Sequence, residues 1–186
     1  CILGRTNGTC TFIANKLSED GMAVVSSDSL NIDSELTIRF VLSYLKLRLN
    51  SSNQNTIKQF FYHFCLLFEH DLTYYDSLFE VIQLENGKKF KTANFDLFLS
   101  KNEGLKGKIL APFESLYDLI EKTFAMFGLS ELKNPYLHHF ADLVHLFESK
   151  NGPDLKLFIQ NYATLPKDAK ALQVPESDQA VKVMTI

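Results

Sequence analysis

Residues 53–68, NQNTIKQFFYHFCLLF, decide the fold class of this chain. Asn53 is a residue type that caps helix N-termini, and apolar side chains then recur at intervals of three and four residues. These apolar positions are Ile57, Phe60, Phe61, Phe64, Leu67 and Phe68. The spacing predicts an amphipathic helix with one buried face, so we expect a helical body around it.

The same periodicity continues on both sides of this stretch. A helix capped by Asp33 or Ser34 is predicted to run to Leu49, and its narrow polar stripe indicates that it is mostly buried. Three further helices are predicted over residues 113–127, 135–151 and 153–162. The core face of the first of these consists of Phe113, Leu116, Tyr117, Ile120, Phe124 and Phe127. We therefore predict a mainly α fold with five or more helices, in which residues 86–107 are the least regular segment.

The two ends of the chain have a different pattern. Residues 1–3 and 22–25 are short apolar segments typical of strands, and residues 10–19 between them are predicted to be helical. Phe12, Ile13 and Leu17 are expected on one face of that helix. Residues 181–186 alternate in the manner of a half-buried strand. We expect this strand to pair in parallel with a strand of the N-terminal unit, as in a piece taken from a larger α/β sheet.

Composition limits the classes of function. With 186 residues, of which 46% are hydrophobic, the chain can bury one substantial core. Its net charge of −3 excludes a general affinity for nucleic acid, so any DNA contact must be local. Three cysteines without pairing or metal-type spacing favour a reducing, cytoplasmic environment. No apolar run approaches the roughly 18 residues that a membrane span needs, so no membrane partner is expected.

Catalytic and metal-binding motifs are not found. Gly4 and Gly8 follow a strand as in a phosphate loop, but they lack the Walker A spacing and its lysine. His138, Asp142 and His145 share one helix face, yet no fourth ligand accompanies them, so a solvated face is favoured over a metal site. We expect no bound cofactor or metal and no catalysis by this chain alone.

One local charge feature stands out in the irregular segment. Its basic residues are Lys88, Lys89, Lys91, Lys101, Lys106 and Lys108. Only Asp96 and Glu103 oppose them there. Such a patch can bind along DNA phosphates. The alternative, a solvated loop rich in lysine, is the favoured interpretation.

Three segments together resemble the UvrD/RecB-type superfamily 1 DNA helicases. The opening CILGRTN, with IANKL at residues 13–17 and VVSSDSL at residues 24–30, is similar to the family pattern ILVRTN…IA..L…G.PVISSESL. Residues 134–155 resemble the helices that precede motif V in the RecB/AddA-like branch. AVKVMTI at residues 180–186 is similar to the start of motif V itself. The order and spacing agree along the chain except over residues 72–112.

The resemblance implies a domain organisation. In this family the RecA-like domain 2A is interrupted by a helical insertion, domain 2B. Residues 1–30 would be a β-α-β fragment of domain 2A, residues 31–178 the 2B insertion, and residues 179–186 the returning strand of 2A. Family members use ATP and magnesium to move 3′ to 5′ on single-stranded DNA, and RecB/AddA-like members carry a nuclease domain elsewhere. The chain would then be an internal piece without the ATPase motifs.

Site residues follow from the same resemblance. Arg5, Thr6 and Asn7 match the family turn beside the single-strand track, and Thr185 matches the motif V threonine close to DNA phosphate. Gly4 departs from the family preference for Val or Tyr. For the duplex ahead of the fork, the candidate contacts are Lys88, Lys89, Lys91, Lys106 and Lys108.

Two functions are therefore expected from different classes. The first is an accessory region of a DNA helicase or helicase-nuclease, which contacts single-stranded and duplex DNA and adjoins the remaining helicase domains. The second is a helical protein-interaction module that docks a partner subunit or regulator. Salt-dependent DNA binding favours the first, and an exposed apolar surface favours the second.

Overall fold

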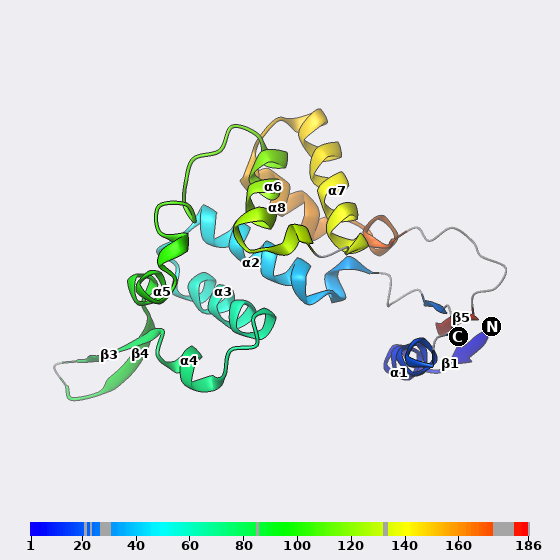
Figure 1. Ribbon diagram of the computed structural model, residues 1–186, viewed down its shortest axis with the longest axis horizontal. Helices are drawn as coiled ribbons and strands as arrows, with labels where there is room; N and C mark the ends of the chain where they lie inside the picture. The colour runs from blue at the N-terminus through cyan, green and yellow to red at the C-terminus, as the bar shows by residue number, and fades with distance from the viewer. Residues whose placement is uncertain are drawn as a thin grey trace. The chain divides into compact units, whose positions relative to one another are not determined.

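The computed structural model describes residues 1–20, 22, 24–26, 31–84, 86–131, 134–172 and 181–185. The chain forms two compact units, the first made of Cys1–Glu35 with Thr164–Ile186 and the second of Leu36–Ala163. Helices dominate the described residues (Figure 1), so the predicted mainly α fold class is confirmed. None of the described helices is long and apolar enough to cross a lipid bilayer.

The first unit contains a three-stranded parallel sheet. Its strands are β1 (Ile2–Gly4), β2 (Val24–Ser26) and β5 (Val181–Thr185), in the order β1-β5-β2. The last strand in the sequence is thus the central strand, and both of its neighbours come from the N-terminal segment. Val183, in the middle of β5, is fully buried. The predicted parallel pairing of this strand with the N-terminal unit is confirmed.

The helix α1 (Asn7–Glu19) begins three residues earlier than predicted. Thr6 causes the early start, because its hydroxyl accepts from Thr9 N at 3.3 Å and its carbonyl from Cys10 N at 3.1 Å. Phe12, Ile13 and Leu17 were predicted to share one face of this helix, but the buried residue is Cys10, and Phe12 is 70% exposed. Phe12 follows Cys10 by two residues, which places it on the opposite side of the helix.

The segments that lead into and out of the helical unit pair with one another. Asn31 and Ala171 form an antiparallel bridge. Asp33, in the 3₁₀ helix η1 (Ile32–Ser34), accepts from Lys170 Nζ at 3.0 Å, and Lys170 ends the 3₁₀ helix η4 (Lys167–Lys170). These contacts place both segments in the first unit. The helical unit therefore spans Leu36–Ala163, whereas the predicted bounds were residues 31 and 178. An inserted domain requires such neighbouring exit and entry points.

The second unit is built from helices around a phenylalanine-rich core. Its described helices are α2 (Leu36–Leu49), α3 (Gln54–Leu67), α4 (Leu72–Asp76), α5 (Phe95–Lys101), α6 (Leu116–Met126), α7 (Pro135–Asn151) and α8 (Leu155–Thr164), with 3₁₀ turns η2 (Glu103–Leu105) and η3 (Leu129–Glu131). Asn53 caps α3 through its side chain, and Asn134 caps α7. The predicted Asn53 cap is confirmed, and so is the predicted start of a helix at residue 135.

Two features of this unit differ from the sequence prediction. Residues 79–93 form an antiparallel hairpin of β3 (Phe79–Gln83) and β4 (Lys89–Ala93), although no strand was predicted there. Tyr117 was predicted on the core face of α6, which is wrong, because it is 38% exposed. It lies at the edge of the buried face, where its ring contacts the His145 ring edge to face.

Candidate nucleic-acid interface

The predicted single-strand contacts share one edge of the parallel sheet. The register pairs Gly4 with Thr185, so both residues lie at the carboxyl ends of neighbouring parallel strands. Arg5, Thr6 and Asn7 follow Gly4 directly and lead into α1. The fold therefore brings together residues from opposite ends of the sequence. Carboxyl ends of parallel strands are the edge where α/β sheets bind ligands.

The turn after β1 is held by backbone and hydroxyl contacts. Thr6 Oγ1 lies 2.9 Å from Thr9 Oγ1 and accepts from Thr9 N, so its side chain serves as the helix cap. Arg5 and Thr6 are exposed. The Arg5 guanidinium can therefore reach a phosphate, whereas the Thr6 hydroxyl is already engaged. The side chains of Asn7 and Thr185 lie outside the described residues.

Gly4, where the sequence departs from the helicase pattern, has a packing role. A Cβ atom built on Gly4 would collide with Cys10 Sγ. Because Cys10 is buried on α1, a larger residue at position 4 would require its side chain to move, whereas glycine allows the helix to approach the end of β1 this closely. The glycine therefore fixes how close the start of α1 lies to the sheet edge.

The predicted duplex contacts are all exposed but fall into two groups. Lys88, Lys89 and Lys91 belong to the hairpin, which extends from the helical body in Figure 1, whereas Lys106 and Lys108 follow η2. Lys91 forms an ion pair with Asp76 at 3.0 Å, which partly neutralises it. The predicted duplex contacts therefore come from two different elements, and each group needs its own test.

The hairpin also exposes apolar side chains, which the sequence prediction missed. Val81, Ile82, Leu84 and Phe90 are each between 39% and 57% exposed. Asn86-Gly87 was the available signal, since this dipeptide between two apolar segments is typical of hairpin turns. Gly87 adopts φ +77°, and its N–H donates to the Leu84 carbonyl at 2.9 Å.

The histidine-bearing face of α7 is exposed at His138, Asp142 and His145. Within the part of the chain that the structure describes, no three His, Cys, Asp or Glu side chains gather in a group that could hold a metal ion.

Comparison with known protein families, curated proteins and solved structures finds no match to this chain.

Proposed function

We propose that this chain is the accessory 2B region, with flanking pieces of domain 2A, of an ATP-dependent 3′ to 5′ DNA helicase of the UvrD/RecB type. The observation that carries the proposal is the β1-β5 register, because it sets the Arg5 turn beside Thr185 at one sheet edge. The paired segments at Asn31 and Ala171 also support it, since a helical insertion between strands of one sheet needs them. ATP and magnesium would bind in the rest of the parent enzyme, which would be either a helicase or a helicase-nuclease.

The sheet edge would act as one wall of a single-strand track. A guanidinium at Arg5 can bind a phosphate with two parallel hydrogen bonds, and an amide at Asn7 can pair with backbone or base. The chain has a formal net charge of −3, so in isolation it offers few such contacts to DNA. We expect it to bind single-stranded DNA with a dissociation constant on the order of 10⁻⁴ M or weaker at physiological salt.

The double substitution Arg5→Ala with Asn7→Ala in the intact helicase tests this function. Removing two hydrogen-bonding side chains is expected to weaken single-strand binding about tenfold and to reduce DNA-stimulated ATP hydrolysis. Nucleotide binding without DNA should stay unchanged, because neither residue belongs to the ATPase motifs. Fluorescence anisotropy with labelled oligonucleotide and steady-state ATPase assays measure both effects. Lys156→Ala removes the same charge from an exposed site on α8 and serves as control. Wild-type unwinding and hydrolysis by the double variant would refute the assignment.

The duplex contacts are tested by two separate charge-neutralising variants. Lys88→Gln with Lys89→Gln changes the hairpin, and Lys106→Gln with Lys108→Gln changes the segment after η2. If a group of lysines contacts duplex phosphates, the variant that lacks it should bind duplex DNA more weakly. The slope of log K against log salt for that variant should also be shallower by about 0.9 per lost contact. Single-strand affinity should not change. If a variant loses duplex and single-strand affinity together, its lysines do not form a separate duplex site.

A second candidate function, docking of a partner protein, is favoured by the hairpin. Its exposed apolar side chains Val81, Ile82, Leu84 and Phe90 are unusual for a two-stranded hairpin in contact with water alone. The outer edges of β3 and β4 are also free of further strands in the described sheet. Protection of these residues from hydrogen exchange by a protein subunit, with no dependence on DNA, would support docking over the helicase contact.

A further inference from the structure

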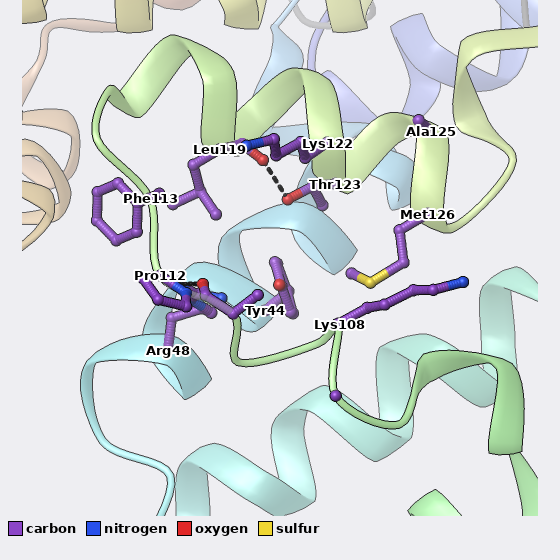
Figure 2. Close-up of a pocket in the computed structure, with 12 residues that line it drawn as sticks. Tyr44, Arg48, Lys108, Pro112, Phe113, Leu119, Lys122, Thr123, Ala125 and Met126 are labelled. Atoms are coloured by element: carbon purple, nitrogen blue, oxygen red, sulfur yellow. Dashed lines mark hydrogen bonds between the residues drawn. The ribbon is translucent and has the colours of Figure 1, made fainter.

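The helical unit contains a pocket of about 470 Å³ that none of the motifs predicted. Its walls come from three parts of the unit: α2, residues 107–113 and α6 (Figure 2). The volume lies within the range of sites that hold small organic molecules. Since α2 is distant in the sequence from the other two parts, no spacing pattern could have revealed the pocket.

The lining combines an apolar interior with basic side chains. Phe113, Leu119 and Met126 supply apolar surface. Arg48, Lys108 and Lys122 are the charged residues of the lining, and no acidic residue belongs to it. Burial raises the pKa of Tyr44, which therefore remains a neutral phenol at physiological pH. The charge of the pocket is thus positive.

Arg48 is fixed in place before any ligand binds. Its two terminal nitrogens donate to the carbonyls of Ile109 and Ala111, and its guanidinium lies 5.3 Å from the centre of the Phe113 ring. Tyr44 donates to the same Ile109 carbonyl at 2.6 Å. Both partners are neutral carbonyls, so the positive charge of Arg48 is not compensated by them. A rigid, half-buried guanidinium beside an aromatic ring is suited to bind an anion.

The two lysines, Lys108 and Lys122, differ in whether a nearby carboxylate neutralises their charge. Lys122 forms an ion pair with Asp118 at 2.7 Å on the exposed side of α6. Among the described residues, no carboxylate lies within ion-pair distance of Lys108 or Arg48. An incoming anion would therefore meet the uncompensated guanidinium of Arg48, with Lys108 adding positive charge on the other side of the pocket, while its apolar body would cover the surface of Phe113, Leu119 and Met126.

We propose that this pocket binds a small organic anion, in which a flat apolar ring system carries one carboxylate or phosphate group. The anionic group would lie toward Arg48, and the ring system would fill the space against α6 (Figure 2). This assignment does not rest on the proposed helicase function, because it uses only the residues of the pocket.

A pair of probes of the same shape tests the charge requirement. The anion 2-naphthoate and its neutral amide, 2-naphthamide, have the same ring system, and 2-naphthyl phosphate tests the second anionic group. We expect saturable binding of at least one anion to the whole chain, with 2-naphthamide about tenfold weaker, as measured by ligand-observed NMR titration. Equal binding of amide and anions, or no binding of any probe, would overturn the proposal.

Three substitutions locate the binding on the protein. Lys108→Gln should weaken binding of the anion about threefold without affecting the amide. Ala125→Phe places a large ring in the pocket from an exposed helix position and should abolish binding of all three probes. Lys89→Gln removes the same charge from the hairpin, outside the pocket lining, and should leave binding unchanged. Circular dichroism confirms that each variant is folded. Undiminished binding by folded Ala125→Phe would show that the probes bind elsewhere and would refute the site.

Discussion

Phe60→Ala is expected to lower the free energy of unfolding of the helical unit by about 3–5 kcal/mol. Phe60 is fully buried on α3. Its ring centre lies 5.3 Å from that of Phe98 on α5, 5.7 Å from that of Phe40 on α2, and 6.4 Å from that of Phe127 at the end of α6. Removing it leaves a cavity where four segments meet, and these rings cannot all move inward to fill it.

Tyr62→Ala is the matched control for this prediction. Tyr62 lies on the same helix and loses the same class of side chain, but it is 53% exposed. We expect its loss to cost less than about 1 kcal/mol. Urea unfolding followed by far-ultraviolet circular dichroism compares the two variants with the wild type. Similar unfolding midpoints for Phe60→Ala and Tyr62→Ala would contradict the central position of Phe60 in the core.

The helices could be predicted because their signals are local. Asn53 and Asn134 are caps whose side chains bind the backbone two or three residues on, and Gly152 ends α7 with φ +75°. The apolar spacing of α3 depends only on the period of the helix. Phe12 and Tyr117 show the limit, because periodicity alone does not determine which residues at the edge of an apolar stripe meet a neighbouring element.

The hairpin escaped prediction because its strands are not half-buried in the usual way. Val81, Ile82 and Phe90 are all exposed, so the alternation that marks a strand packed on a core is lost. The lysines of β4 favoured an interpretation of this segment by its charge, although Asn86-Gly87 was the better signal for a hairpin.

The two candidate sites differ in whether the sequence could predict them. The edge formed by the Arg5 turn and Thr185 could be anticipated, because parallel strands place their carboxyl ends together once their pairing is proposed. The pocket beside Arg48 could not, because its lining depends on the tertiary packing of α2 and α6. A sequence records which residues follow a strand, whereas a cavity is the space that packed side chains leave unfilled.

The second large effect is expected at Glu148, a residue of α7 that caps a different helix. The first N–H groups of any α-helix lack partners within the helix. In α6, Leu116 N donates to Glu148 Oε1 at 2.9 Å, and Tyr117 N and Ser115 Oγ each donate to Glu148 Oε2 at 3.0 Å. One carboxylate therefore satisfies three donors and places a negative charge at the positive end of the helix dipole.

Glu148→Gln is expected to lower the free energy of unfolding at pH 7 by about 2 kcal/mol, because one carboxylate oxygen becomes an amide nitrogen facing donors. Glu114→Gln, an exposed substitution next to the same helix start, is the control and should have little effect.

The difference between Glu148→Gln and the wild type should also depend on pH. Burial acts to raise the pKa of Glu148, but the hydrogen bonds from Tyr117, Leu116 and Ser115, together with His145, outweigh it, so the pKa is lowered. A carboxyl group with a lower pKa in the folded state stabilises the fold above its unfolded pKa, which is about 4.3. That contribution is lost as the pH falls through the folded value. Wild type and Glu148→Gln should therefore differ most at pH 6–7 and converge in urea unfolding below about pH 4. A difference that stays constant from pH 7 to pH 3 would mean that the ionised carboxylate is not what holds the start of α6.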